Sequence, residues 1–339
     1  MSILNNKPYI IAEAGVNHNG EISASLRLVD IARVAGADCI KFQVFNAKEL
    51  TTKNSPKAEY QKTYDNEENQ QDMLLKYELK ENELKEIKQY CDNKNIGFLA
   101  TPFSPKWVKI LYDIDVKMFK ISSGSIRSLA LLKEVGRTGL PIILSTGMSV
   151  INEIREAISI LKDNGCKDLF LLHCVSSYPV QIEKINLFSI QFLKDEFNLP
   201  VGFSDHTREI ETGGLAVAAG AEILEKHFTL SNKLKGPDHQ MSLLPNELKD
   251  YIERARRISV ICGKKEKQPL EEELDMKKIV QTSIVAKRFI KKDEKILKDM
   301  LTEKRPGTGI SPLYTDNIIG KIAIRDIEID DILSYGDLN

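Results

Sequence analysis

Residues 201–227 read VGFSDHTREIETGGLAVAAGAEILEKH, and this stretch indicates how the larger part of the chain folds. Two short apolar runs, Val201–Ser204 and Ile223–His227, have the length and composition of buried strands. The segment between them, Glu209–Ala219, has the pattern of a helix. A strand, a helix and a second strand in this order form the unit from which parallel sheets are built.

The same alternation continues in both directions along the chain. Further strands are expected at Tyr9–Ala14, Cys39–Gln43, Gly97–Thr101, Lys117–Ile121, Ile142–Ser145 and Leu169–Cys174. Further helices are expected, among others, at Ala24–Ala35, Glu81–Asn93, Ile151–Asn164, Ile185–Phe197 and Pro245–Ile261. Eight strand–helix units over about 260 residues are typical of an α/β fold, the (β/α)8 TIM barrel. An open doubly wound sheet is the alternative, but no G-x-G-x-x-G turn follows the first strand.

The chain changes character after the last of these helices. The stretch KKEKQPLEEELDMKK at 264–278 is typical of a solvated linker or a surface helix. Short β-branched runs separated by turns follow it and indicate a small β-rich domain. We therefore expect a barrel over residues 1–265, a linker over 266–280 and a second domain over 281–339.

A long polar insertion, Asn46–Leu79, follows the second expected strand and contains NSPKAEYQKTYDNEENQQ. Long loops at this end of barrel strands often cover a substrate. A disordered surface loop is the other interpretation, and the sequence leaves both open.

Composition excludes several classes of partner. The net charge of −1 gives no field suited to nucleic acid or to an anionic membrane. No apolar run approaches the roughly 20 residues of a membrane span, and the N-terminus lacks a signal-peptide pattern. The five cysteines form no close pairs: Cys39, Cys91, Cys166, Cys174 and Cys262. Buried free thiols in a cytoplasmic protein are the simplest interpretation.

All five histidines fall at or just after the ends of expected strands, where the active sites of barrel enzymes lie. His206 and His227 end adjacent strands, so their side chains are expected to converge. Two neutral imidazoles with open coordination positions suit a divalent metal such as Mn²⁺, Zn²⁺ or Fe²⁺ acting as a Lewis acid. We expect structural roles for His18 and His173, whereas the role of His239 stays open.

Lys41 and Lys120 each lie in an otherwise apolar strand, and a buried ammonium must pair with negative charge or lose its proton. One lysine could form a Schiff base with a carbonyl substrate. Alternatively, both could hold a polyanion such as phosphoenolpyruvate, and hydroxyl groups at neighbouring strand ends favour this second interpretation. These hydroxyl groups belong to Thr101, Ser145 and Ser204. A structural ion pair between Glu13 and Lys41 is a further alternative.

At these residues the sequence resembles the N-acylneuraminate (sialic acid) synthase family. The matching segments are IIAEAGVNHNG (10–20), IKFQ (40–43), ATPF (100–103), FKISSG (119–124), ILSTGM (143–148), LLHC (171–174), YP (178–179), VGFSDHT (201–207), EKHFT (225–229) and GPDH (236–239). Near the end, KRPGTG (304–309) resembles the family's SAF, or antifreeze-like, domain. The resemblance covers nearly the whole chain.

The resemblance implies a (β/α)8 barrel followed by a SAF domain, in a domain-swapped homodimer. It implies that His206 and His227 hold Mn²⁺, with Mg²⁺ or Co²⁺ as alternatives, and that Arg305 reaches the partner's active site. Glu13, Lys41 and Lys120 are the implied catalytic residues, the two lysines binding phosphoenolpyruvate. The other implied substrate-binding residues are Gln43, Thr101, Ser123, Ser145, Ser176, Tyr178, Ser204 and Asp238.

The implied activity is a metal-dependent transfer that joins phosphoenolpyruvate to an N-acetylated amino sugar and releases phosphate. N-acetylmannosamine, giving N-acetylneuraminate, is the expected acceptor; a 6-deoxy-diacetamido sugar, giving N,N'-diacetyllegionaminate, is the alternative. A related synthase acting on a sugar phosphate, a Schiff-base aldolase and a non-catalytic binding protein are less favoured. Ser125 stands where many members have an acidic residue, and Val175, Ser176 and Ser177 also depart from the pattern. The first departure shifts proton transfer toward Glu13 or a metal-bound water.

Overall fold

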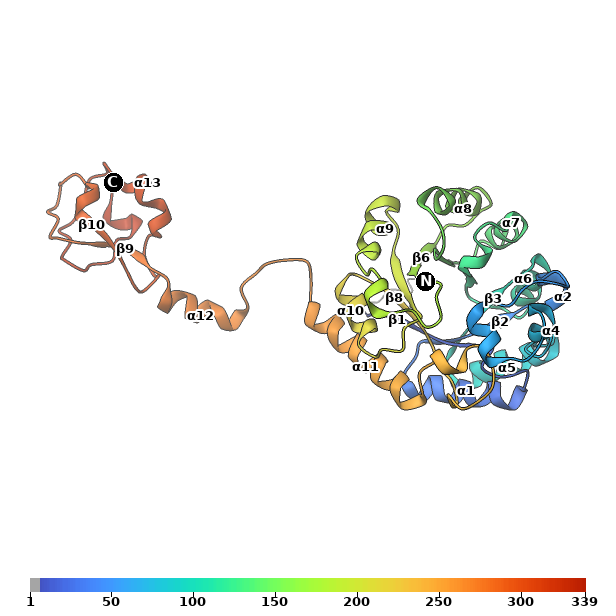
Figure 1. Cartoon of the computed structure of the whole chain (residues 1–339). Coiled ribbons are helices and arrows are strands. Elements are labelled where there is room, and N and C mark those ends of the chain that lie inside the picture. The colour runs from blue at the N-terminus through green and yellow to red at the C-terminus, as the bar shows by residue number, and fades with distance from the viewer. Residues whose placement is uncertain (1–6) are drawn as a thin grey trace. The chain divides into compact units, whose positions relative to one another are not determined.

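The computed structural model describes residues 7–339, apart from the side chains of residues 60, 63 and 64. The chain divides into two compact units, with the boundary between Gly263 and Lys264. Figure 1 shows the elements of both units in chain order.

Eight parallel strands form one sheet in the first unit. They are β1 (Tyr9–Gly15), β2 (Cys39–Val44), β3 (Gly97–Pro102), β4 (Phe119–Ile121), β5 (Ile142–Ser145), β6 (Leu169–Cys174), β7 (Val201–Asp205) and β8 (Ile223–His227). Their order is β3-β2-β1-β8-β7-β6-β5-β4, and the two ends of this order, β3 and β4, contact each other. The sheet therefore closes on itself, which confirms the predicted (β/α)8 barrel.

Helices connect successive strands and cover the outside of the barrel (Figure 1). They are α1 (Ile22–Ala35), α5 (Glu81–Lys94), α6 (Pro105–Asp113), α7 (Leu129–Arg137), α8 (Ile151–Asp163), α9 (Ser189–Phe197), α10 (Thr212–Ala218) and α11 (Pro245–Cys262). Each buries an apolar stripe; in α1 it is formed by Leu28, Val29 and Ala32. These stripes and the outward-facing residues of the strands form the main core.

Two helices begin later than the sequence predicts. α9 begins at Ser189 instead of Ile185, because Asn186 adopts a φ of 45°, which a helix cannot continue through. α10 begins at Thr212 instead of Glu209, since the Glu209 carbonyl accepts a hydrogen bond from a lysine side chain on β8. In both cases a local feature, a backbone conformation in one and a hydrogen bond in the other, sets where the helix begins.

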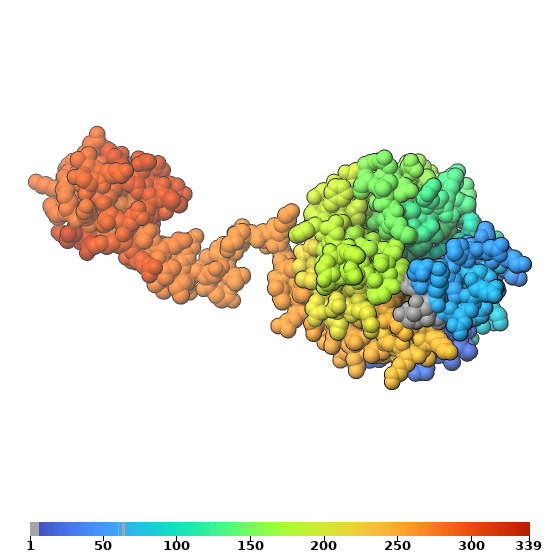
Figure 2. All heavy atoms as spheres, viewed as in Figure 1, coloured from blue at the N-terminus to red at the C-terminus, as the bar shows by residue number. Residues whose placement is uncertain are grey.

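The insertion after β2 folds into three short helices, so the disordered loop is the wrong interpretation. They are α2 (Ala47–Leu50), α3 (Glu59–Tyr64) and α4 (Gln70–Leu75). Met73 and Tyr77 pack with Val16 and Phe45 in a small apolar cluster of their own. This cluster attaches the insertion, drawn in blue in Figure 2, to the loop after β1.

The second unit has its own small core and confirms the predicted β-rich domain. Helix α12 (Glu271–Val280) precedes the antiparallel pair of β9 (Ser283–Ala286) and β10 (Leu301–Lys304), and α13 (Thr315–Ile318) follows. The core consists of Ile284, Ala286, Ile290, Ile296, Met300, Ile310, Ile318, Ala323, Ile327, Leu333 and Leu338. No residue of α12 is buried, as the charged composition of this stretch predicts.

The expectation of buried thiols is correct for four of the five cysteines. Cys262 is exposed, because it lies in the last turn of α11 beyond the part of this helix that packs on the barrel. None of the helices within residues 7–339 has the length and apolar character needed to cross a bilayer.

Candidate active site

The carboxyl ends of the barrel strands surround a cavity of about 730 Å³. Every barrel residue to which the sequence assigned a site role lines it: Glu13, Lys41, Gln43, Thr101, Lys120, Ser123, Ser145, Ser176, Tyr178, Ser204, His206, His227 and Asp238. Arg305 lies in the second unit, where it is exposed, and its role in a partner's pocket stays a prediction. The insertion also contributes to the cavity wall, through residues of and next to α3 and α4.

Strand alternation explains why these polar side chains gather. Side chains two positions apart in a strand point to the same face, and an apolar residue stands two positions before most of the polar ones. Ile11 precedes Glu13, and Leu99 precedes Thr101 in this way. These apolar residues form one buried cluster inside the barrel: Ile11, Cys39, Leu99, Ile143, Phe170, Leu172 and Ile223. The polar side chains therefore stand on an apolar layer that closes the cavity from below.

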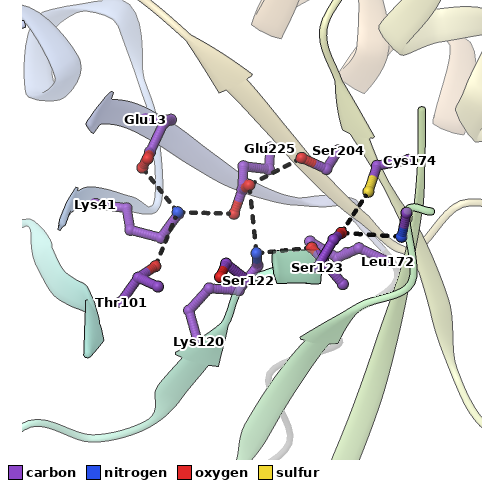
Figure 3. A network of polar contacts seen from close by, with 12 residues as sticks. Glu13, Lys41, Thr101, Lys120, Ser122, Ser123, Leu172, Cys174, Ser204 and Glu225 are labelled. Carbon is purple, nitrogen blue, oxygen red and sulfur yellow. Dashed lines mark hydrogen bonds and ion pairs between the residues drawn. The ribbon is translucent and has the colours of Figure 1, made fainter. Parts of the chain in front are cut away.

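Two buried ammonium groups lie at the base of the cavity, connected by one carboxylate (Figure 3). Lys41 Nζ lies 3.0 Å from Glu13 Oε2 and 3.5 Å from Glu225 Oε2. Lys120 Nζ lies 3.5 Å from Glu225 Oε1, the second oxygen of the same carboxylate. Glu225 thus bridges the two lysines, and the ion pair between Glu13 and Lys41 that the sequence left open is present.

Hydroxyl groups complete the surroundings of both ammonium groups. Lys41 Nζ donates to Thr101 Oγ1 at 3.2 Å, and Lys120 Nζ donates to Ser145 Oγ at 2.7 Å. Ser204 Oγ donates to Glu225 Oε1 at 2.9 Å. These three hydroxyls are the ones that the sequence placed beside the lysines, and they reach the same network.

Burial and neighbouring charges set the protonation of this network. Burial opposes the charged form of Glu225, but the ammonium groups of Lys120 and Lys41 outweigh it and hold the pKa of Glu225 at about 2. Burial likewise opposes the charged form of Lys41, but Glu13 and Glu225 raise its pKa above the ordinary value. Burial lowers the pKa of Lys120 and raises that of Glu13. Glu13 is therefore the carboxylate of this network that takes up a proton most readily.

His206 and His227 lie side by side in the cavity wall, with ring centroids 5.7 Å apart. The Tyr178 ring lies 4.3 Å from that of His206. His206 Nδ1 lies 2.8 Å from the carbonyl oxygen of Val175, which can only accept, so Nδ1 carries the proton and Nε2 keeps its lone pair. Burial lowers the pKa of both histidines, so both are neutral.

The donor set of this pair fits a divalent metal ion. His227 Nδ1 is buried without a hydrogen-bond partner among the described residues and lies 3.9 Å from Asp238 Oδ2. Within residues 7–339, no third histidine, cysteine or carboxylate completes a metal-binding group. Two neutral imidazoles would therefore leave several positions of an ion open to a substrate.

The three remaining histidines have structural contacts and do not line the cavity. His173 Nε2 lies 2.7 Å from the Ile185 carbonyl oxygen, and His18 Nδ1 accepts the Gly20 N–H at 3.0 Å. His239 Nδ1 lies 2.6 Å from Thr229 Oγ1. His18 and His173 do not reach the cavity, so a structural role stays the prediction for both, and His239 also connects loops.

The sequence-based site assignments missed Glu225. It lies in the apolar strand β8, and the rule that singled out Lys41 and Lys120, a charge inside an apolar strand, applies to it equally. Cys174 was also absent from them; its Sγ lies 3.1 Å from Ser123 Oγ in the cavity wall. Ser125, at the position of the family's acidic residue, does not line the cavity, and its Oγ accepts from Ser122 Oγ at 3.2 Å.

The fold and the cavity define a (β/α)8-barrel enzyme with its active site at the carboxyl ends of the strands. The NeuB family model matches residues 28–267, and the SAF domain model matches residues 281–339. The chain belongs to the NeuB family of sialic acid synthases, which are phosphoenolpyruvate-condensing transferases. The resemblance stated from the sequence is thereby confirmed.

Relatives match over nearly the full chain. The chain is 44% identical over 330 residues to the N,N'-diacetyllegionaminic acid synthase of Campylobacter jejuni, covering 96% of this chain and 99% of the relative. It is 32% identical over 333 residues to the human N-acetylneuraminate-9-phosphate synthase, with coverages of 96% and 91%. A solved N-acetylneuraminic acid synthetase from Leptospira borgpetersenii, in complex with citrate, is 38% identical, with coverages of 80% and 91% and a TM-score of 0.74.

We predict that Glu225→Gln destabilises the barrel by about 3 kcal/mol or more, because two buried ammonium groups lose the carboxylate between them. Urea unfolding followed by fluorescence of the chain's single tryptophan, Trp107 of α6, measures this cost. Glu222→Gln is the control, since it breaks a partly exposed pair with Lys194 and should cost at most about 1 kcal/mol. Equal costs for the two variants would contradict the bridging role.

Proposed function

We propose that this enzyme condenses phosphoenolpyruvate with an N-acetylated amino sugar and water, giving a nine-carbon sialic-acid-type sugar and phosphate. The observation that carries the proposal is the meeting of two buried ammonium groups and two neutral histidines in one cavity of a NeuB-family barrel. The ammonium groups suit an anionic donor, and the histidines lie beside them, where the acceptor would react.

The lysines and hydroxyls form the donor site in this proposal. Phosphoenolpyruvate carries a phosphate and a carboxylate, and the ammonium groups of Lys41 and Lys120 offer two separate positive charges. Thr101 and Ser145, which contact these ammonium groups, add hydroxyl donors. Glu225 holds both lysines in place, since each of its oxygens lies 3.5 Å from one ammonium group.

The reaction forms one carbon–carbon bond and breaks one bond to phosphate. C3 of phosphoenolpyruvate bonds to the aldehyde carbon of the open-chain sugar, water adds at C2, and phosphate leaves from C2. Lys120 would hold the departing phosphate. Glu13 would accept the proton released by the water, because its pKa is raised by burial and its side chain faces the cavity beside Gln43 and Asp238. The former aldehyde oxygen would take up this proton to become the hydroxyl of the product.

His206 and His227 would hold a divalent ion, which we propose to be Mn²⁺, with Mg²⁺ or Co²⁺ as alternatives. Such an ion would supply a Lewis acid for the aldehyde oxygen. The Val175 carbonyl fixes the tautomer of His206 that leaves Nε2 available to it. The homodimer in which Arg305 reaches a partner's cavity is part of the same proposal.

For the acceptor, we propose the 6-deoxy-diacetamido sugar, with N-acetylmannosamine as the second candidate. The 44% identity to the C. jejuni enzyme supports the first, and the 38% identity to the Leptospira protein supports the second. Apolar side chains in the cavity wall suit the methyl groups of a sugar with two acetamido groups and no 6-hydroxyl. They belong to Val16, Met73, Leu74 and Phe103.

We predict that phosphate release from phosphoenolpyruvate requires an amino sugar and that kcat/KM is higher for the diacetamido acceptor than for N-acetylmannosamine. A coupled phosphate assay with each acceptor, and product identification by mass, gives both values. A higher kcat/KM for N-acetylmannosamine would reverse the ranking of acceptors. Absence of phosphate release with either sugar would contradict the condensation itself.

Lys120→Met is predicted to lower kcat/KM for phosphoenolpyruvate by at least about 10²-fold, because the phosphate loses a buried cationic partner. Glu225 keeps Lys41 in this variant, so the fold should persist, which Trp107 fluorescence can verify. Lys194→Met removes a lysine outside the cavity and should retain full activity. Wild-type kinetics in folded Lys120→Met would exclude the lysine from donor binding.

Metal removal separates this mechanism from Schiff-base chemistry. Dialysis against EDTA should abolish phosphate release, and added Mn²⁺ should restore it, because in this proposal the two histidines hold the ion that acts as the Lewis acid. A lysine aldolase would stay active in EDTA and would be trapped on a lysine by borohydride. Full activity in protein that elemental analysis shows to be metal-free would contradict the proposed metal site.

A further inference from the structure

Strands β7 and β8 present two different sets of side chains to their two faces. Ser204, Glu225 and His227 line the cavity, whereas Asp205 and Lys226 do not line it and are buried. The register of the two strands places Asp205 directly opposite Lys226. A second pair of buried charges therefore lies behind the cavity wall, and the reaction proposed above does not use it.

These two charges are fully enclosed and tightly connected. Lys226 Nζ lies 2.9 Å from Asp205 Oδ2, and the two side chains are 1% and 0% exposed. The aromatic ring of Tyr251, on α11, lies 5.3 Å from Lys226 Nζ. Thr212, the first residue of α10, donates its hydroxyl to Asp205. The ion pair thus connects two strands with the two helices packed outside them.

The ion pair also fixes the backbone that follows β7. Lys226 Nζ donates to the carbonyl oxygens of Thr207 at 2.7 Å and Glu209 at 3.3 Å. Asp205 Oδ1 accepts the Thr207 N–H at 2.9 Å and the Thr207 hydroxyl at 2.8 Å. His206 lies between Asp205 and Thr207 in the sequence, so hydrogen bonds fix the residues on both sides of it.

Helices α10 and α11 pack tightly beside this ion pair. A Cβ added to Gly213 of α10 would lie 2.4 Å from Cζ of Tyr251, so only glycine permits this approach of the two helices. A buried ion pair adds little net stability compared with a well-packed apolar pair, but its contacts are directional. Directional contacts on both strands are what two metal ligands need to keep a fixed separation.

We propose that the Asp205–Lys226 ion pair is a positioning element that sets the spacing of His206 and His227 and thereby their affinity for a first-row divalent cation. Each member directly precedes one of these histidines in the sequence, and the two members meet across the strand pair. The inference rests on the metal site of the proposed function.

The test measures Mn²⁺ binding to the full chain by electron paramagnetic resonance titration. Asp205→Asn/Lys226→Met removes both charges together, so no unpaired charge is buried, and thermal unfolding verifies that the variant folds. Its dissociation constant for Mn²⁺ should rise at least about tenfold. The visible spectrum of the Co²⁺-loaded variant should also shift, because that spectrum reports the geometry of the ligands.

Lys194→Met is the matched control, since it breaks another ion pair of the same barrel. This pair joins Lys194 of α9 to Glu222, which directly precedes β8. The control should leave the Mn²⁺ affinity unchanged. If the double variant does not fold, Asp205→Asn/Lys226→Gln takes its place, because it also buries no unpaired charge and keeps an acceptor oxygen for Thr207 and an amide donor for the Thr207 and Glu209 carbonyls. A folded variant with wild-type Mn²⁺ affinity and an unchanged Co²⁺ spectrum overturns the inference.

The wild-type titration separates this inference from the proposals on which it rests. Failure of the wild type to bind Mn²⁺ overturns the metal site and the positioning role together. Phosphate release that still depends on the amino sugar would, in that case, leave the condensation reaction standing.

Discussion

The active site depends on two ammonium groups that stay close together and buried inside a barrel. Like charges in an enclosed space repel, and burial alone would drive protons off both. Glu225 opposes this by placing one carboxylate oxygen against each lysine, and the lysines in turn keep the Glu225 carboxylate ionised. Glu13 supplies the second negative charge on Lys41. The formal charges of these two lysines and two glutamates thus cancel, and both ammonium groups still line the cavity that an anionic donor would enter.

Strand β8 shows how the fold separates the residues of the cavity from those behind it. In β8, Glu225 and His227 face the cavity, and Lys226 between them faces the outer helices. Because neighbouring side chains in a strand point to opposite faces, a three-residue sequence contributes to two polar networks that do not mix. The apolar layer below the cavity and the main core outside the sheet keep these networks apart from solvent.

Most of the barrel was predictable because its strands are short apolar runs with sharp ends, and every predicted strand is present. The polar residues at those ends were predictable for the same reason, since parallel strands bring their carboxyl ends together. The late start of α9 at Ser189 was not, because it depends on the conformation of Asn186. Nor was the pairing of Glu225 with both lysines, because sequence reveals a buried charge but not which of several neighbours it contacts.

The exposure of Cys262 allows the native chain to be labelled at a single thiol. The other four cysteines are buried, and this thiol stands at the end of α11, immediately before the boundary between the two units. A maleimide dye or a nitroxide would therefore attach to the native chain at one accessible place. A second label engineered into the SAF domain would make the distance between the two units measurable by energy transfer or dipolar spectroscopy.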